Sequence, residues 1–295
     1  EQPENSEQTG YFYMWKQKIG ISIGSHYAIP LPEFVAMLRK IGFEAISPGW
    51  STELGVIVSA AKECGLEIQS LHAPFSGAKA MWNPDEKVSA PAKEELFRAL
   101  EDCHKYEIPI LVMHTWIGFG SSFNPTEEGF ANYGELVKRA GEYGIRIAFE
   151  NTEGEEYLYA LMERFRDCDN VGFCWDSGHE LCYNHSTDLL AKFGDRLLVT
   201  HLNDNLGIRS YDGVTTWHDD LHLLPFDGIA DWEYNTDRLL KARPLDILNF
   251  ELNIESKPER HENDKYGKTP LEEYFTEAYI RACRVVYRVA QKRNG

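Results

Sequence analysis

The feature that most constrains the fold of this chain is the regular alternation of short apolar runs with longer amphipathic stretches. Each run is rich in Ile, Val, Leu or Phe, which is typical of strands that are covered on both faces. In one of the stretches between them, Phe34, Val35, Leu38 and Ile41 recur at the spacing of a single helical face. We predict eight strands, at 18–24, 43–47, 67–72, 109–114, 145–150, 171–176, 196–201 and 246–251. We predict helices at 31–41, 53–64, 94–104, 135–143, 156–166 and 271–293.

Strands that alternate with helices pair in parallel through right-handed crossovers. Eight such units in 295 residues match the size of one closed (β/α)8 TIM barrel, which places the chain in the α/β class. A doubly wound open sheet is the main rival, but its usual G-x-G-x-x-G turn is missing after the first strand, where residues 24–27 read GSHY. We therefore expect a single domain over 1–295, with an N-terminal extension at 1–16, a mobile loop at 253–269 and a final helix at 270–295. That helix can pack on the barrel exterior or in the interface of a homo-oligomer, and both remain open.

Composition argues against several classes of partner. The net charge of −17 opposes binding to nucleic acid or anionic lipid. No run approaches the roughly 18 apolar residues that a membrane span needs. The six cysteines include no C-x-x-C pair, and the polar residues 1–10 lack the apolar core of a signal peptide. We therefore expect free thiols, a cytoplasmic location and no membrane partner.

Imidazole and carboxylate side chains stand at the ends of the predicted strands. The carboxyl ends of all strands in a parallel barrel meet at one face, so these side chains converge there. Buried carboxylates that cluster without a cation repel one another and are costly to desolvate, and this predicts a metal site. At or just past strand ends stand His26, His72, His114, Glu150, Asp176, His179, His201 and Glu251, and the loop after the seventh strand adds Asp220 and His222.

The types of donor indicate the kind of metal. Glu150, Asp176, His201 and Glu251 form an oxygen-rich set with one imidazole, which suits Mn, Mg, Co or Zn. A second set could hold additional zinc-like ions, and it comprises His72, His114, His179, Asp220 and His222. A register error would exchange the last two residues for their neighbours His218 and Asp219.

Seven segments together resemble the xylose isomerase-like TIM-barrel superfamily, which includes sugar isomerases and epimerases and the endonuclease IV class of AP endonucleases. They are SLHAPF (70–75), VMHTW (112–116), AFENTEG (148–154), VGFCWDSGHE (171–180), THLNDN (200–205), DLHLLPFDGIADW (220–232) and NFELN (249–253). In the epimerase branch, this resemblance implies one metal on Glu150, Asp176, His201 and Glu251. It also implies that the two glutamates transfer protons and that His179 contacts substrate hydroxyls. In the endonuclease branch, it implies a trinuclear zinc cluster that also uses His72, His114, His179, Asp220 and His222.

The charge of the loops favours the epimerase branch. Up to the following helix, the loops after strands one, two, four, five and six contain no Lys or Arg, whereas a DNA-repair enzyme must hold several phosphates. Aromatic residues in the loops suit a neutral sugar or polyol. They are Trp50, Phe75, Trp82, Trp116, Phe119 and Trp217.

The leading prediction is a metal-dependent sugar isomerase or epimerase that acts through an enediolate on a small carbohydrate. Glu150 and Glu251 would transfer the proton, and His179, Trp116 and Arg209 would bind the substrate. The alternatives are a trinuclear-zinc phosphodiesterase, a lyase that uses the same enediolate chemistry, and a partner-dependent sugar-binding barrel.

Overall fold

The computed structural model describes residues 17–121, 124–210 and 212–294, in which strands and helices alternate along the chain. The strands are β1 (Lys18–Ile23), β2 (Ala45–Pro48), β3 (Glu67–Ile68), β4 (Leu71–His72), β5 (Ile110–His114), β6 (Arg146–Glu150), β7 (Val171–Asp176), β8 (Leu197–His201) and β9 (Ile247–Phe250). The α-helices are α1 (Leu31–Ile41), α2 (Leu54–Cys64), α3 (Glu86–Lys105), α4 (Glu127–Glu142), α5 (Glu155–Arg164), α6 (Ser177–Cys182), α7 (Leu189–Phe193), α8 (Trp232–Lys241) and α9 (Leu271–Asn294). Short 3-10 helices are η1 (Ala78–Trp82), η2 (Gly194–Arg196) and η3 (Trp217–Asp219).

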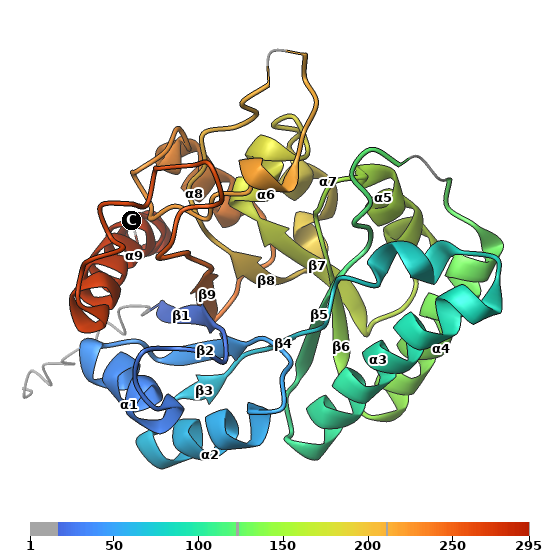
Figure 1. Cartoon of the computed structure of the whole chain (residues 1–295), viewed down its shortest axis with the longest axis horizontal. Helices are drawn as coiled ribbons and strands as arrows, with labels where there is room; N and C mark the ends of the chain where they lie inside the picture. The colour runs from blue at the N-terminus through green and yellow to red at the C-terminus, as the bar shows by residue number, and fades with distance from the viewer. Residues whose placement is uncertain (1–16, 122–123, 211, 295) are drawn as a thin grey trace, which may run out of the picture.

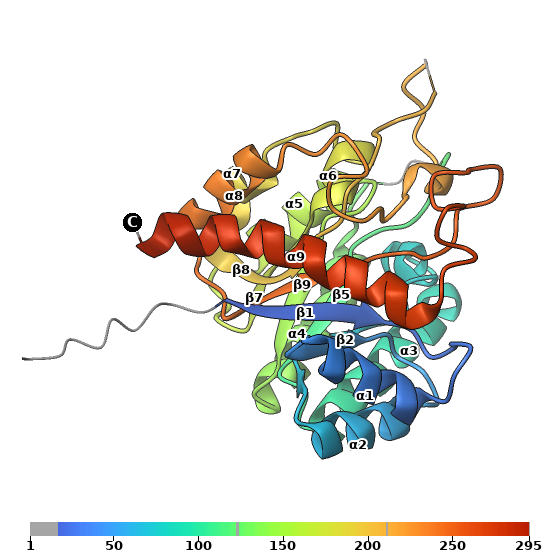
Figure 2. The same cartoon turned by 90° about the vertical axis from the view of Figure 1, so that its left-hand side faces the viewer.

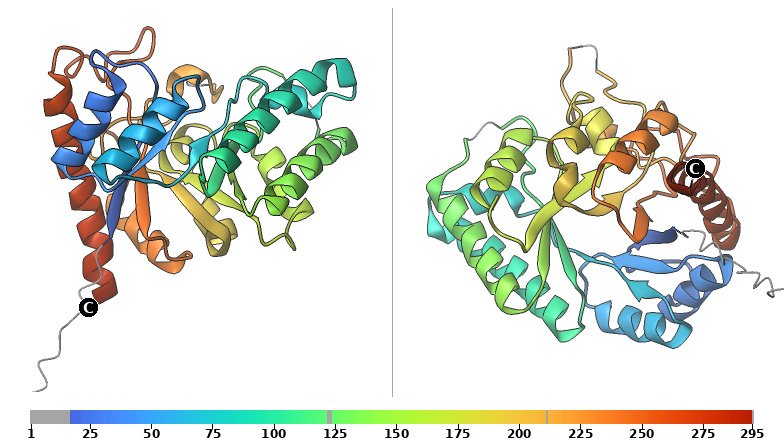
Figure 3. Two further views of the ribbon diagram at one scale, coloured as in Figure 1. Left: turned by 90° about the horizontal axis from the view of Figure 1, so that it is seen from below. Right: turned by 180° about the vertical axis from the view of Figure 1, so that it is seen from behind.

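The strands form a closed parallel barrel, which confirms the predicted α/β class and (β/α)8 fold. One hydrogen-bonded arc runs in the order β3-β2-β1-β9 and the other runs from β4 to β8. Parallel bridges from Gly49 to His72 and from Leu202 to Phe250 join the two arcs on both sides. Figure 1 shows the strands at the centre, and Figure 3 shows from behind that helices surround them.

The predicted strand 67–72 is wrong as one continuous element, because its two ends pair with different neighbours. β3 pairs with β2, whereas β4 pairs with β5. Between them the Gln69 side chain donates to the Ile247 carbonyl, and the Ser70 hydroxyl bonds the Ser47 hydroxyl at 3.0 Å. β3 and β4 together therefore occupy one strand position of the barrel, and the change of pairing partner at these two polar residues connects the two arcs.

The final helix packs on the barrel exterior, one of the two positions left open by the sequence. Figure 2 shows α9 lying along the outside of the barrel beside β1. Its inward side chains, such as Phe275, Ala282 and Val289, are buried, while Ile280 and Tyr287 are at least half exposed. Residues 253–269 contain no helix or strand, and their mobility stays a prediction. Residues 1–16 lie outside the described part of the chain.

Two further sequence expectations can be compared with the structure. All six cysteines are free thiols. None of the helices in residues 17–121, 124–210 and 212–294 has the length and apolar content that crossing a lipid bilayer requires.

Residue alternation along the strands places the polar groups inside the barrel. Side chains two apart on a strand share a face. A buried cluster separate from the main core is formed by Ile110, Val112, Ala148, Cys174, Leu198 and Val199. Two residues after Val112, Ala148, Cys174 and Val199, toward the carboxyl ends, come His114, Glu150, Asp176 and His201. Along each of these strands, the inward-facing side chains therefore change from apolar to ionisable within two residues.

Asp204 fastens the long loop after β8 to the barrel. Its carboxylate is fully buried and accepts hydrogen bonds of 2.9–3.0 Å from four donors. Three are the backbone N–H groups of Asn205, Phe226 and Ala230, and the fourth is the indole N–H of Trp232. The loop that carries Asp220 is thus held at both ends by one side chain.

We expect Asp204→Asn to lower the free energy of unfolding by about 2–3 kcal/mol, because hydrogen bonds to a charged group are lost and an amide N–H faces other donors. Urea denaturation measures this change. Asp167→Asn is the matched control, since the Asp167 side chain is 93% exposed. Equal stability of the two variants would contradict the role of Asp204.

Candidate active site

Four predicted metal ligands from four successive barrel positions meet at the carboxyl end of the barrel. Glu150 ends β6, Asp176 ends β7, His201 ends β8, and Glu251 directly follows β9. One ligand atom from each lies within 4.8 Å of those from the other three. We call these four residues the donor cluster. The first three side chains are essentially inaccessible, while the Glu251 side chain is 25% exposed.

Glu150 is the centre of this arrangement. Its Oε1 atom lies 3.0 Å from His201 Nδ1. Its Oε2 atom lies 3.2 Å from both His72 Nε2 and His114 Nε2. The same His201 Nδ1 atom is 2.7 Å from Glu251 Oε2, so one imidazole nitrogen stands between the two glutamates.

A second group of predicted ligands lies beside the first. Asp220 Oδ1 is 2.8 Å from His222 Nε2 and 3.3 Å from His179 Nε2. Asp176, His179 and His222 also bring ligand atoms within 4.8 Å of one another. The structure therefore selects Asp220 and His222. Their neighbour Asp219 instead forms a capping box with Thr216 at the start of η3.

Three of the histidines are oriented by the protein backbone. The Nδ1 atom of His72 donates to the Ala73 carbonyl at 2.8 Å, and that of His179 donates to the Asn151 carbonyl at 2.8 Å. His222 Nδ1 donates to the carbonyl of Glu251 at 3.2 Å. These bonds leave the Nε2 atoms facing the carboxylates, where each can carry a proton or, once that proton is lost, bind a metal ion.

Asn203 and Gly178 are supporting residues near Asp176. The Asn203 amide donates to both Asp176 oxygens, at 2.9 and 3.1 Å. A Cβ atom at Gly178 would lie only 1.9 Å from Asn203 Oδ1, so glycine is required there. Asn203 thus holds the Asp176 carboxylate in its place within the donor cluster.

The carboxylates of the donor cluster ionise in unequal surroundings. Burial opposes ionisation of Glu150, but His201 and His114 hold the pKa of Glu150 well below its usual range. Burial likewise opposes ionisation of Glu251, but His201 lowers the pKa of Glu251 to about 2. Burial raises the pKa of Asp176.

Three of the histidines carry the compensating charge, whereas burial lowers the pKa of His114. Burial disfavours their charged forms, but the surrounding acidic groups outweigh it and raise the pKa of His179 to about 10. Asp220 raises the pKa of His222 to about 9 against the same effect of burial. The pKa of His201 also lies well above its usual value, in spite of burial, because of Cys174 and the two glutamates. Without a metal ion, protons on these rings supply positive charge at neutral pH.

The donor set fits a divalent cation. Buried carboxylates and imidazoles that converge on a common centre are ligands for Mn, Mg, Co or Zn. The raised pKa values of the histidines fit a site whose carboxylates require nearby positive charge. The preset Nδ1 hydrogen bonds supply the tautomer that ligation through Nε2 needs.

A cavity of about 500 Å³ opens onto these ligands. Its wall includes Phe75, Phe119, Tyr183 and Trp217, so aromatic side chains surround the ionisable groups as the sequence suggested. Sequence reasoning missed Lys257 as a wall residue, although the segment 253–269 in which it lies is rich in charged residues. Other lining residues are His72, His114, Ile117, Glu150, Thr152, Glu153, His179, Asp220, His222, Glu251 and Asn253.

Two residues expected to bind substrate lie elsewhere. Trp116 is 1% exposed and stacks on Tyr157 with ring centroids 4.1 Å apart, so it packs beneath the loops. Arg209 has an exposed side chain and does not line the cavity. Neither side chain lines the cavity, because aromatic or basic character in a loop does not determine which way a side chain points. A role of either residue in substrate binding stays a prediction.

Comparisons with known proteins agree with this architecture. Residues 35–274 match the sequence model of the xylose isomerase-like TIM barrel family. Two curated relatives match over shorter stretches. The uncharacterized protein y4fM of Sinorhizobium fredii is 33% identical over 99 residues, which are 30% of this chain and 32% of the relative. The uncharacterized protein MJ1311 of Methanocaldococcus jannaschii is 26% identical over 153 residues, 46% of this chain and 51% of the relative.

Solved structures match over nearly the whole chain. The IolI protein with a bound zinc atom has a TM-score of 0.69 at 18% identity and covers 91% of this chain and 98% of its own. D-psicose 3-epimerase from Clostridium cellulolyticum H10, solved with D-tagatose, has a TM-score of 0.69 at 14% identity, with coverage of 92% and 99%. L-ribulose 3-epimerase also scores 0.69 at 14% identity, with coverage of 94% and 97%. At these identities the likeness establishes the shared fold.

We expect metal binding to release protons and to strengthen as pH rises from 6 to 9. The pKa values of His179, His201 and His222 are raised, so these rings hold protons at pH 7. A cation on the donor cluster needs a free nitrogen on His201, and its positive charge disfavours the protons on the neighbouring rings of His179 and His222. Affinity should then increase about tenfold per pH unit for each proton displaced. Calorimetric titration of chelator-treated protein with Mn²⁺ or Zn²⁺, in buffers of different ionisation enthalpy, counts these protons.

His179→Gln should reduce the number of protons released, whereas His261→Gln should not, since the His261 side chain is 82% exposed. Binding heats that do not depend on the buffer would be inconsistent with protonated ligands.

Proposed function

The chain belongs to the xylose isomerase-like TIM-barrel family, and we propose that it is a sugar epimerase or isomerase that works with a divalent metal. One observation carries this proposal. Glu150 and Glu251 lie on either side of a single nitrogen, His201 Nδ1, beside a cavity with aromatic walls. Two carboxylates in such a position suit the removal of a proton and the return of another.

The residues that would hold the metal are Glu150, Asp176, His201 and Glu251. A divalent cation there would polarise a substrate carbonyl and stabilise negative charge on its oxygen, a contribution of several kcal/mol. Mn, Zn, Mg and Co are all compatible with these donors.

The two glutamates would divide the proton transfer. One removes the proton from the carbon beside the carbonyl, and the electron pair of that C–H bond moves toward the carbonyl oxygen to give an enediolate. The other returns a proton to the opposite face of the same carbon, which inverts the centre. Alternatively it returns the proton to the former carbonyl carbon while the hydroxyl proton passes to the former carbonyl oxygen, which exchanges ketose and aldose. Each placed carboxylate of this kind typically contributes about 10²–10⁴-fold to the rate. His179, which lines the same cavity, would hold substrate hydroxyls.

We expect Glu150→Gln and Glu251→Gln each to lower kcat by about 10²–10⁴-fold, because an amide cannot accept the proton. Turnover on a panel of ketoses and aldoses, at saturating metal, measures the loss. Incorporation of solvent deuterium at the substrate carbon reports the proton transfer itself. Glu163→Gln is the matched control, with a side chain that is 72% exposed on α5. Retention of the full rate by both active-site variants would refute the assignment.

A metal-dependent phosphodiesterase is the second candidate, and a specific observation favours it. His72, His114, His179, Asp220 and His222 also converge on the donor cluster, which is enough to hold further zinc ions. The charge of the wall opposes this candidate, because Lys257 is the one Lys or Arg among the described residues that line the cavity. A polyanion needs several cationic contacts.

Elemental analysis and a nicking assay separate the two candidates. We expect fewer than three zinc ions per chain and no cleavage of a duplex that contains an abasic site. Three tightly held zinc ions together with salt-sensitive nicking would establish the phosphodiesterase instead.

A further inference from the structure

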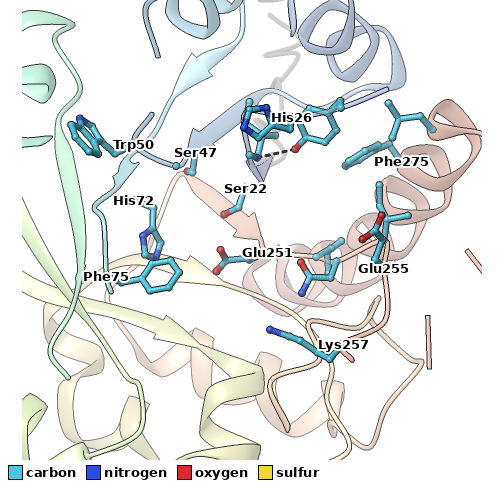
Figure 4. Close-up of a pocket in the computed structure, with 18 of the residues that line it drawn as sticks. Ser22, His26, Ser47, Trp50, His72, Phe75, Glu251, Glu255, Lys257 and Phe275 are labelled. Carbon is cyan, nitrogen blue, oxygen red and sulfur yellow. Dashed lines mark hydrogen bonds between the residues drawn. The ribbon is translucent and has the colours of Figure 1, made fainter. Parts of the chain in front are cut away.

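A second, larger lobe adjoins the cavity over the donor cluster. Its volume is about 930 Å³, and it is lined by the ends of β1, β2 and β4, the segment after β9 and the start of α9. We call this lobe the annex. Both lobes share a set of wall residues, namely His72, Phe75, Glu251, Asn253 and Lys257. Figure 4 shows the Glu251 carboxylate pointing into the annex between Ser22 and the pair formed by His72 and Phe75. A molecule that reacts at Glu251 can therefore extend into either lobe.

The annex presents polar groups that have no partner in the protein. The side chains of His26, Asn253 and Glu255 line it and form no hydrogen bond or ion pair within the described part of the chain. The Ser22 hydroxyl accepts a bond from Asn249 and keeps its own proton to donate. These donors and acceptors suit the hydroxyl groups of a sugar.

Fixed aromatic rings border the same space. Phe75, at the junction of the lobes, is 49% exposed and stacks on His114 with centroids 4.8 Å apart. Trp50 is anchored by its indole N–H, which donates to Asp102 at 2.8 Å. Tyr27 stacks on Phe34 at 3.6 Å. Rings held in this way offer apolar faces without a further loss of conformational freedom on binding.

The charge of the annex argues for an uncharged ligand. Its one Lys or Arg is Lys257, whose Nζ atom lies 3.5 Å from Asp220 Oδ2. Glu251 and Glu255 contribute negative charge to the wall. A phosphate or other anion in this lobe would meet carboxylates with no free cation to balance it.

We propose that the substrate is a neutral glycoside of two sugar units, with the reacting unit beside Glu251 and the second unit in the annex. This inference rests on the proposed function, because that function identifies the reacting unit as a sugar. Pockets for small molecules span roughly 300–1,000 Å³. Each lobe alone falls in that range, so a single monosaccharide would leave one of them filled only with water.

The experiment compares monosaccharides with disaccharides in the manganese-loaded protein. D-fructose and D-tagatose are the single-ring probes, and lactulose and palatinose are the two-ring ketose probes. Calorimetry gives Kd, and an epimerisation assay gives kcat/KM. We expect at least one disaccharide to bind and react at least tenfold better than either monosaccharide.

Gly49→Leu tests whether the annex is responsible. Gly49 lines the annex, and an added Cβ would meet only the Ile23 carbonyl oxygen, at 3.9 Å. Leucine should therefore fit locally and narrow the lobe. His26→Ala removes a polar group of the same wall without adding volume. Gly49→Leu should lower the ratio of disaccharide to monosaccharide kcat/KM at least tenfold, and His26→Ala should lower it at least fivefold. Gly134→Leu on α4, where an added Cβ lies 4.0 Å from Phe165, is the matched control and should leave both constants unchanged.

The outcomes separate this inference from the proposed function. Equal or better binding and turnover of the monosaccharides overturns the annex proposal and leaves the epimerase intact. Disaccharide binding that is weakened in Gly49→Leu, without turnover of any probe, supports the annex and refutes the proposed reaction. Failure of every disaccharide to bind overturns the inference.

Discussion

The arrangement of this molecule depends on the burial of one carboxylate. Glu150 is fully inaccessible, and removing a charge from water costs several kcal/mol even after the protein relaxes. Every ion pair of Glu150 within the described ranges is made with a histidine, namely His72, His114, His179 and His201. A lysine or arginine would balance the charge of Glu150 permanently. A histidine can lose its positive charge by releasing a proton. The barrel end is therefore suited to exchanging protons for a metal ion.

The predicted metal ligands are also held in place before any metal ion binds. The backbone carbonyls of Ala73, Asn151 and Glu251 fix three imidazole rings from behind. Because these carbonyls belong to the strand ends themselves, formation of the barrel also sets the tautomers. The loop that carries Asp220 is held separately, by the buried carboxylate of Asp204. The strand ends, the first turn of α6 and one fastened loop thus supply all the predicted ligands.

Local patterns in the sequence were enough to predict the barrel and the convergence of ionisable side chains at the ends of its strands. Side-chain alternation determines that Glu150 and Asp176 face inward, and closure of the barrel brings them together. Contacts between residues far apart in the chain could not be predicted from these local patterns. Helix α4 was predicted to begin at residue 135 but begins at Glu127, where the Thr126 hydroxyl caps it by accepting from the Gly129 N–H. This first turn packs against Trp82, since a Cβ at Gly129 would be only 2.2 Å from the Trp82 ring. Helix α3 begins at Glu86 rather than at 94 and includes Pro91, a residue that sequence reasoning treats as a helix boundary.

The freedom of loop side chains explains why the cluster at the strand ends was easier to predict than the wall of the cavity. The side chain of a strand residue points to one of two faces of the sheet. The side chain of a loop residue such as Arg209 or Lys257 can point in many directions, and only tertiary packing determines which one it takes. Yet the choice between reactions depends on these loop residues, because a phosphodiesterase and an epimerase can use the same cluster of donors. Lys257 is the one Lys or Arg in the described walls of both lobes, and it already lies beside Asp220. A wall with so little positive charge offers a polyanion too few cationic contacts, whereas hydroxyl groups can bind to the unpaired polar side chains and aromatic rings that line the annex.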